Sequence, residues 1–300
     1  MNLLHRNIRE GTKQQYRRTA QRIAEKIGVK ELTIKTIKDN YALIYNLLQS
    51  VSLHQRKFYI TVLLVIVSPI PKQPIDPLLH RELVNLLHLN HNNYMSERKT
   101  NKKNPKEEKN WMNWDEVLAI RENLEKKYLS TNSYDDLTNL ILISLYTIQR
   151  PRRLEYADCI IINENEYKSL SLDDKKKSIF LVVANTHMYF SFGVDATKTE
   201  IYKNYQIVAV KQNLYQLLRT YINNNNSRYL LSKNNGNKIS HAALRSRLNN
   251  IFGKKKISAS MLRKIYISSL PPDISFAERE NIANEMGHTA ITAMKIYNKI

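Results

Sequence analysis

The chain reads Ser260-Met261-Leu262-Arg263-Lys264, then Met286-Gly287-His288, then Tyr297, and these three segments decide how its fold and chemistry are interpreted. Arg263 lies among apolar residues that recur at helical spacing, and Tyr297 follows nine positions after His288. A guanidinium binds two phosphate oxygens, an imidazole exchanges a proton near neutral pH, and a phenolic oxygen can attack phosphorus. This ordered set of residue types indicates chemistry on a phosphodiester.

The order and spacing of these residues resemble the tyrosine recombinase (phage-integrase) family. The resemblance implies that Tyr297 is the nucleophile, and that Arg263 and His288 bind the scissile phosphate. The family's box is His-x-x-Arg, whereas this chain has Ser260 three residues before Arg263. A serine donates a hydrogen bond but cannot exchange a proton near neutral pH. More of the acid–base role is therefore expected to fall on Lys198 and His288, and reduced activity is an open alternative.

The family's first arginine is expected directly after a helix, where residues 149–156 read Gln-Arg-Pro-Arg-Arg-Leu-Glu-Tyr. This segment is similar to the Pro-Pro-x-Arg-x-Glu box of integrases from eukaryotic DNA viruses, virophages and mobile elements. That register selects Arg153, with Glu155 as its supporting acid. The commoner bacterial spacing, three residues before the glutamate, selects Arg152 instead, and we favour Arg153. Arg150 stands where the variant box has its first proline, and it is expected to contact DNA.

The family also places a lysine on a β-hairpin, close to the leaving 5′ oxygen. Residues 196–206 precede a predicted strand and contain two candidates, of which Lys198 fits best and Lys203 is second. Both positions are inferred from their order among the family's boxes. Other basic residues are expected to bind the DNA backbone, namely Lys254, Lys255, Lys256, Lys264, Arg17 and Arg18.

Charge and composition limit the class of partner. A formal net charge of +20 on 300 residues with 42% hydrophobic content indicates a globular protein that binds an extended polyanion, most simply nucleic acid. The sequence contains no run of 18 apolar residues, which is the length needed to span a membrane, and it has no recognisable secretion signal. An intracellular location is therefore expected. If the source is viral, this location is the cytoplasm or nucleus of the host cell. The single cysteine, Cys159, excludes an intramolecular disulfide.

Hydrophobic periodicity predicts an α+β fold. We expect an all-helical core-binding domain over residues 1–100, a basic linker over 101–112, and a mostly helical catalytic domain with a small antiparallel sheet over 113–300. The stretch 91–110 has almost no apolar residues and cannot bury a core. The predicted helices are 12–27, 32–48, 53–67, 78–89, 114–128, 134–148, 213–223, 240–252, 258–269, 276–286 and 290–300. The predicted strands are 159–162, 178–183, 188–192 and 206–210.

The resemblance implies a site-specific recombinase that cleaves and rejoins double-stranded DNA through a 3′-phosphotyrosine. It implies no ATP, metal or other cofactor, and a homo-tetramer on DNA formed from a protein that can be monomeric in solution. Two alternatives remain open at this point. A type IB topoisomerase uses the same cleavage chemistry to relax DNA. A catalytically weakened DNA-binding derivative of the fold would account for Ser260.

Overall fold

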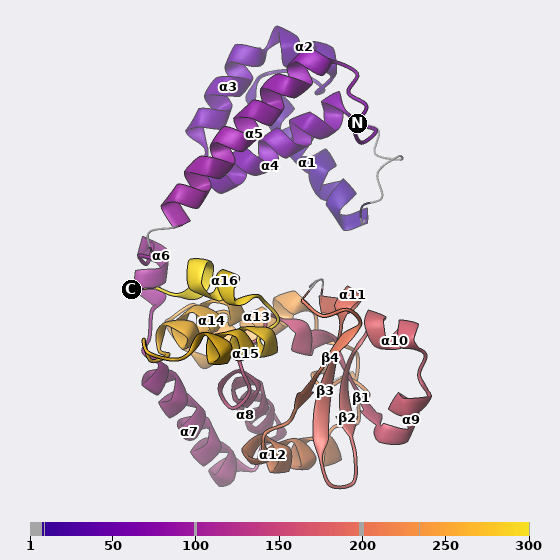
Figure 1. The fold of residues 1–300 in the computed structure, drawn as a ribbon, viewed down its shortest axis with the longest axis vertical. Coiled ribbons are helices and arrows are strands. Elements are labelled where there is room, and N and C mark those ends of the chain that lie inside the picture. Colours follow the sequence, from indigo (N-terminus) through magenta and orange to yellow (C-terminus); the bar gives the residue numbers. More distant parts are fainter. Residues whose placement is uncertain (1–7, 9, 99–100, 198–200, 234, 300) are drawn as a thin grey trace. The chain divides into compact units, whose positions relative to one another are not determined.

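The computed structural model describes residues 8, 10–98, 101–197, 201–233 and 235–299. The chain divides into two compact units, residues 1–100 and 101–300, and each has its own hydrophobic core (Figure 1). The described part of the chain contains no helix both long and apolar enough to cross a membrane. The α+β fold class predicted from the sequence is confirmed.

The first unit is organised around α4 (Leu53–Val67), which is apolar on nearly all of its faces. Tyr59, Val62, Leu63 and Val67 of this helix are almost fully buried. A helix that is apolar all round is stable in water only when other elements cover it. Four other helices contact it, and these are α1 (Glu10–Lys26), α2 (Ile34–Asp39), α3 (Tyr41–Ser50) and α5 (Pro77–Arg98).

Two helices of this unit differ from the predicted bounds. The single helix predicted over 32–48 is interrupted at Asn40, which has φ −116° and ψ 24° and separates α2 from α3. The Asn40 side chain donates to the carbonyl oxygen of Thr36, because asparagine readily bonds nearby backbone instead of continuing a helix. The last helix, α5, continues to Arg98, well past the predicted end at residue 89.

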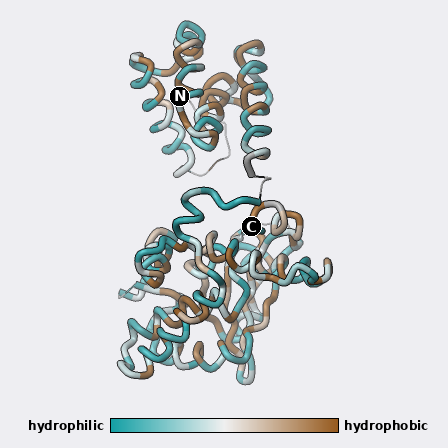
Figure 2. The backbone as a smooth tube through the Cα atoms, turned by 90° about the vertical axis from the view of Figure 1, so that its left-hand side faces the viewer, coloured by the Kyte–Doolittle hydropathy of each residue, from teal (hydrophilic) through white to brown (hydrophobic). Residues whose placement is uncertain are grey.

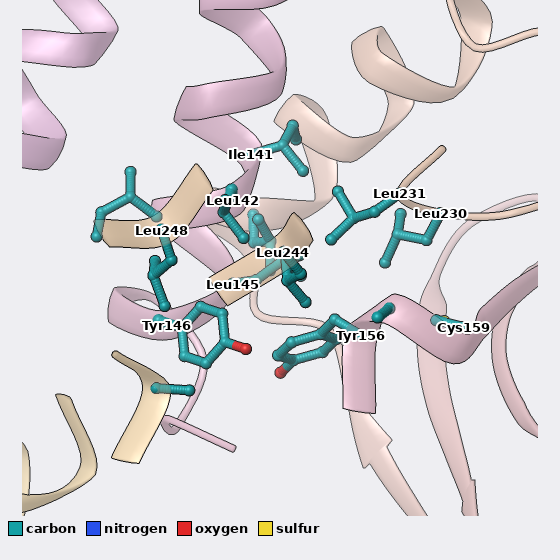
Figure 3. Close-up of a cluster of buried hydrophobic side chains, with 14 of the residues drawn as sticks. Ile141, Leu142, Leu145, Tyr146, Tyr156, Cys159, Leu230, Leu231, Leu244 and Leu248 are labelled. Carbon is teal, nitrogen blue, oxygen red and sulfur yellow. The ribbon is translucent and has the colours of Figure 1, made fainter. Parts of the chain in front are cut away.

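The second unit is built around α8 (Tyr134–Thr147), in which Leu140, Ile141, Leu142 and Leu145 are fully buried. Figure 3 shows Ile141, Leu142 and Leu145 of this helix in one buried cluster with Leu244 and Leu248. Hydrophobic and hydrophilic residues alternate along the surrounding helices (Figure 2), as expected where one helix face is buried. The helices packed on α8 are α7 (Trp114–Thr131), α12 (Gln212–Asn223) and α13 (His241–Ile251).

A four-stranded sheet lies beside these helices, in the order β1-β2-β3-β4 (Figure 1). Its strands are β1 (Cys159–Asn163), β2 (Ile179–Val183), β3 (Met188–Gly193) and β4 (Tyr205–Ala209), all within one residue of the predicted bounds. The prediction of an antiparallel sheet was wrong for one pair, because β1 pairs with β2 in parallel. Two short helices, α9 (Glu164–Ser169) and α10 (Leu172–Lys177), provide the crossover that a parallel connection requires.

The remaining elements of the second unit are short helices, several of which lie near the beginning or the end of its sequence. Residues expected to form a linker include a helix, α6 (Pro105–Asn110), which belongs to the second unit. The others are η1 (Glu155–Asp158), α11 (Val194–Thr197), α14 (Ala259–Ser268), α15 (Phe276–Glu285), α16 (Ala290–Thr292) and η2 (Ala293–Tyr297).

Gly193, at the end of β3, lies against the backbone of α10. A Cβ atom at this position would overlap the carbonyl oxygen of Lys176 and lie 2.5 Å from that of Lys175. Backbone atoms cannot move aside as the end of a side chain can, so we expect Gly193→Ala to lower the free energy of unfolding by at least about 2 kcal/mol. Both tryptophans belong to the second unit, so tryptophan fluorescence during urea unfolding measures this unit.

Gly11→Ala in α1 is the matched control, because nothing lies within 4 Å of the Cβ it would add. Its tryptophan transition should coincide with that of the wild type. A wild-type transition for Gly193→Ala would contradict the predicted clash.

Candidate active site

The candidate site is built on the C-terminal end of α15. Gly287 has φ +72°, the left-handed conformation that favours glycine. The His288 N–H donates to the carbonyl oxygen of Ala283 at 3.0 Å, and the Gly287 N–H donates to that of Asn284 at 2.9 Å. These two bonds form a Schellman motif, the common way for a helix to end at glycine. The Gly-His step therefore ends α15 and turns His288 into the protein, where its exposed fraction is 3%.

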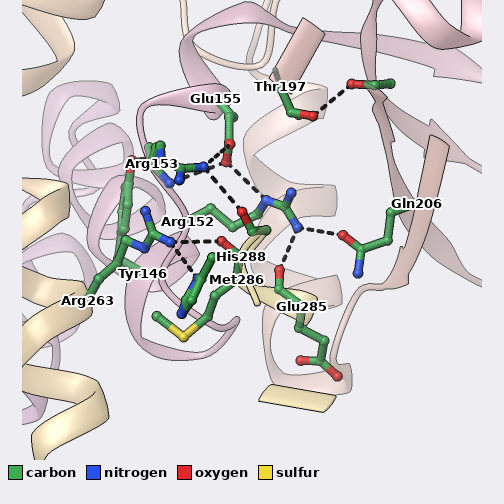
Figure 4. A network of polar contacts seen from close by, with 12 residues as sticks. Tyr146, Arg152, Arg153, Glu155, Thr197, Gln206, Arg263, Glu285, Met286 and His288 are labelled. Atoms are coloured by element: carbon green, nitrogen blue, oxygen red, sulfur yellow. Dashed lines mark hydrogen bonds and ion pairs between the residues drawn. The ribbon is translucent and has the colours of Figure 1, made fainter. Parts of the chain in front are cut away.

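Three arginines donate to three consecutive backbone carbonyl groups at this helix end (Figure 4). The pairs are Arg152 with Glu285 at 2.5 Å, Arg263 with Met286 at 3.4 Å, and Arg153 with Gly287 at 3.2 Å. The last carbonyl groups of a helix have no partner within it and carry the negative end of its dipole, so cations stabilise this end. The helix end thereby gathers arginines from two distant parts of the sequence.

Arg152 is enclosed on every side, with an exposed fraction of 1%. Its Nε donates to Glu155 at 3.0 Å, its Nη1 also donates to Gln206 at 3.0 Å, and its guanidinium carbon lies 3.6 Å from the centre of the Phe192 ring. A Cβ on Gly287 would lie 2.8 Å from Nη2, a second reason for glycine there. Arg152 thus joins η1, the sheet and the end of α15.

The adjacent Arg153 has different surroundings. Its side chain is 45% exposed, and its Nη1 lies 3.8 Å from a carboxylate oxygen of Glu155. Its backbone is held in place because the Tyr146 hydroxyl donates to the Arg153 carbonyl oxygen at 2.6 Å. A fixed backbone with a half-exposed guanidinium suits a residue that binds a ligand from solution.

Arg263, His288 and Tyr297 are in mutual contact. Arg263 is fully buried, and its Nη2 lies 2.5 Å from Nδ1 of His288. The guanidinium carbon of Arg263 lies 4.3 Å from the centre of the Tyr297 ring, within the range of a cation–π contact. The centres of the His288 and Tyr297 rings are 4.9 Å apart. The structure therefore brings together the three residues with which the sequence argument began.

The contact with Arg263 determines the tautomer of His288. A guanidinium has no acceptor, so Nδ1 of His288 must accept and Nε2 must carry the proton. Burial, reinforced by the charge of Arg263, lowers the pKa of His288 to about 3, and the ring is neutral at pH 7. Burial also lowers the pKa of Arg263, to about 10, which leaves it a cation at that pH.

Four buried nitrogen atoms of this cluster have no hydrogen-bond partner within the part of the chain that the structure describes. They are Nε and Nη1 of Arg263, Nη2 of Arg152 and Nε2 of His288. A buried donor without an acceptor costs about 1–3 kcal/mol, and nearly all such groups in folded proteins are paired. All four atoms are donors, and the arginines are cations. The cluster is therefore chemically suited to an anion with several acceptor oxygens.

Two candidates, one from the box of Arg263 and one from the hairpin, remain apart from this cluster. Ser260 is exposed on α14 and lines a cavity of about 180 Å³ with Glu107 and Lys264. Lys203 is exposed in the segment before β4. Lys198, the preferred lysine, lies outside the described residues.

The basic residues expected to bind DNA divide into exposed and internally bonded side chains. Arg150 donates to the Tyr266 hydroxyl, and its Nε lies 3.5 Å from the Glu285 carboxylate. Lys255 donates to the carbonyl oxygen of Trp111. Lys264 pairs with Glu107 inside the protein, whereas Arg17 pairs with Glu10 at 3.2 Å on the surface. The exposed residues are Lys254, Lys256, Arg17 and Arg18.

Gln206 on β4 was missed by the sequence analysis. Its Oε1 accepts from Arg152, while its Nε2 donates to the carbonyl oxygen of Asn284 at 2.9 Å. It joins the sheet to both the arginine and the end of α15. A single glutamine in a strand carries no signal of such a role, because both partners are distant in sequence.

The helix predicted over 290–300 is a short α-helical turn, α16, followed by the π-helical turn η2. The Asn298 N–H donates to the carbonyl oxygen of Ala293, five residues earlier, at 3.0 Å. π-helical turns occur frequently at functional sites. Here the turn contains Tyr297, whose exposed fraction is 8%.

Comparisons with known proteins give a single type of match. No protein-family model and no curated protein sequence matches the chain. Among solved structures, the crystal structure of XerA recombinase is similar at 13% sequence identity and a TM-score of 0.41. The match covers 98% of this chain and 88% of that one. At this level of similarity, function has to be inferred from the residues of the site.

The stability of the second unit should depend on the protonation of His288. Its pKa falls from 6.5 to about 3 on folding, so between these pH values the unfolded state binds a proton that the folded state does not. Stability is therefore lost as pH falls through this window. We expect wild type to lose up to about 1.4 kcal/mol per pH unit more than His288→Asn, measured by urea unfolding between about pH 6 and pH 4.

His187→Asn serves as the control, because His187 is an exposed histidine of the same unit. It should keep the wild-type dependence on pH. Parallel curves for wild type and His288→Asn would contradict the burial of a neutral imidazole.

Proposed function

We propose that this chain is a site-specific DNA recombinase of the integrase type, which cleaves and rejoins strands through Tyr297. The observation that carries the proposal is the group of buried, unpartnered donors on Arg263 and His288, in contact with a tyrosine ring. A phosphodiester offers two non-bridging oxygens as acceptors and a phosphorus atom as the electrophile. This combination of donors and nucleophile matches it in both charge and chemistry.

In the proposed complex, Arg263 and Arg153 bind the non-bridging oxygens, and the Nε2–H of neutral His288 donates to one of them. These donors are positioned before the substrate arrives, so they stabilise the negative charge that grows in the transition state. Arg263 contributes most, because its charge is screened least by water. Since the arginines supply positive charge, the proposed reaction requires no metal ion.

The proposed reaction exchanges one phosphodiester for another. The Tyr297 oxygen forms a bond to phosphorus and loses its proton, while the bond from phosphorus to the 5′ oxygen breaks and that oxygen gains a proton. The product is a 3′-phosphotyrosine and a 5′ hydroxyl. Lys198 is the proposed general acid for the leaving oxygen, on the basis of the family resemblance. Attack by a 5′ hydroxyl of another duplex reverses the step and joins the new strands without ATP.

Two further features belong to this proposal. The large positive charge of both units supports binding to double-stranded DNA through its phosphates, with the first unit as the second half of a clamp. Recombination of two duplexes requires four strand cleavages, and each chain supplies one Tyr297. A homo-tetramer on DNA is therefore the proposed active assembly.

The first test is to trap the covalent intermediate. We expect wild-type protein incubated with supercoiled or nicked DNA in EDTA, then denatured in detergent, to give a stable protein–DNA adduct. Tyr297→Phe should give none, because it keeps the ring over Arg263 and removes only the attacking oxygen. Denaturing gel electrophoresis of labelled DNA measures the adduct.

Tyr134→Phe is the matched control, because it removes the hydroxyl of an exposed tyrosine of the same unit, which contacts Asn225 and not the proposed catalytic residues. It should still form the adduct. An adduct that persists in Tyr297→Phe would overturn the assignment of the nucleophile. Relaxation of plasmid without any joined products would favour a topoisomerase.

The adjacent arginines should separate into two classes of mutant. We expect Arg153→Ala to abolish adduct formation and change the free energy of unfolding by less than about 1 kcal/mol, because its guanidinium is half exposed. We expect Arg152→Ala to lower that free energy by about 3 kcal/mol, because it leaves the buried Glu155 carboxylate without its closest partner. Urea unfolding and the trapping assay measure the two effects.

Affinity for a random duplex should change little in Arg153→Ala, because many other cations contact the DNA backbone. Full cleavage by Arg153→Ala together with normal stability of Arg152→Ala would show that the two roles are reversed or absent.

A further inference from the structure

A second feature of the fold concerns α6, which begins five residues after the boundary between the two units. Its start is fixed by a capping box, in which Asn104 Oδ1 accepts from the Glu107 N–H and Glu107 Oε2 accepts from the Asn104 N–H, both at 3.0 Å. Glu107 and Asn110 are both only 7% exposed. A short helix with so few apolar residues is therefore held by its polar contacts.

Those contacts attach α6 to the helix that carries Arg263. Glu107 Oε1 forms an ion pair with Nζ of Lys264, whose side chain is 17% exposed. Asn110 Oδ1 accepts from the backbone N–H of Lys256, just before α14, at 2.7 Å. Next along the chain, the carbonyl oxygen of Trp111 accepts from Lys255. The segment 104–111 is thus bonded both to the body of α14 and to the residues just before it.

Lys264 and Arg263 are consecutive residues of α14, so their side chains leave the helix about 100° apart. The ion pair holds one side of the helix, and this fixes the rotation of α14 about its own axis. The Arg263 guanidinium lies about 6 Å from that axis, so a rotation of about 10° moves it by about 1 Å. A displacement of this size in a catalytic group can lower a rate by about 100-fold.

We propose that Glu107 is a positioning residue for Arg263, acting through Lys264 to fix α14 at the angle that phosphate binding requires. The inference rests on the proposed function and assigns a role to a residue that touches neither the substrate nor the reacting atoms.

The charges of the pair support this role. Burial raises the pKa of Glu107, but the Lys264 ammonium and the Asn104 N–H outweigh it and hold the pKa below its ordinary value. Glu107 is therefore ionised at neutral pH. Neutralising it leaves Lys264 largely buried without a counter-charge, which favours movement of that side chain toward water and with it a rotation of α14.

The test uses Glu107→Gln in the full chain and separates DNA binding from catalysis. The substitution raises the net charge by one, so the affinity for a random duplex should stay the same or increase. The rate of adduct formation at saturating plasmid DNA should nevertheless fall by about tenfold or more. Opposite changes in affinity and rate distinguish positioning from an effect on DNA binding.

Glu108→Gln is the matched control, because Glu108 is exposed on the same helix and its substitution changes the net charge by the same amount. It should keep the wild-type rate. Lys264→Met should also slow the reaction, and the double variant Glu107→Gln/Lys264→Met should be no slower than the worse single variant. Such non-additivity is expected when two residues act only through each other.

The urea transition followed by tryptophan fluorescence shows whether each variant remains folded, and Lys264→Met provides the second variant if Glu107→Gln does not. A wild-type rate in folded Glu107→Gln, or additive losses in the double variant, would overturn the inference and leave the proposed function standing. No adduct from the wild-type protein would overturn both.

Discussion

The organisation of the site depends on the backbone carbonyl groups at the C-terminal end of α15. Four consecutive carbonyl groups there, from Asn284 to Gly287, accept hydrogen bonds from side chains of three other parts of the chain. In order, the donors are Gln206, Arg152, Arg263 and Arg153. Because a helix end is rigid and its carbonyls point in known directions, it fixes the guanidinium groups relative to one another. The Schellman turn at Gly287 then places His288 against Arg263. A backbone feature therefore sets the geometry of the side chains proposed to bind phosphate.

Burial of these side chains determines their protonation and also lowers the stability of the protein. The guanidinium groups of Arg152 and Arg153 share one carboxylate, Glu155, and those of Arg152 and Arg263 are almost fully buried. The same burial keeps His288 neutral, so its Nε2 is a permanent donor near neutral pH and does not exchange protons there. His288 is thus proposed to bind the phosphate rather than carry a proton. The acid–base role then falls on another group, which is consistent with the expectation placed on Lys198.

The sequence was sufficient to predict features that depend on local pattern, and it failed where distant contacts decide. The strands, α14 and α15 follow from apolar periodicity and end signals, and Gly287 marks the end of α15. The preference for Arg153 over Arg152 rested on the family resemblance alone, because neighbours in a loop differ only in what lies around them. Arg152 is buried by contacts with β4 and α15, both far away in sequence. For α6, the capping box was the available signal, but the lack of apolar residues concealed it.

Two pairs of neighbouring cations show the same division of roles. In each pair, one residue is proposed to bind phosphate, Arg153 or Arg263, while its neighbour, Arg152 or Lys264, holds an element in place through a carboxylate. Consecutive side chains leave the backbone in different directions, so adjacent cations readily serve different surroundings. A net charge of +20 is therefore a poor measure of the number of DNA contacts, since several cations are bonded inside the protein. These internal cations give the phosphate-binding ones their fixed positions, so they serve catalysis without contacting the substrate themselves.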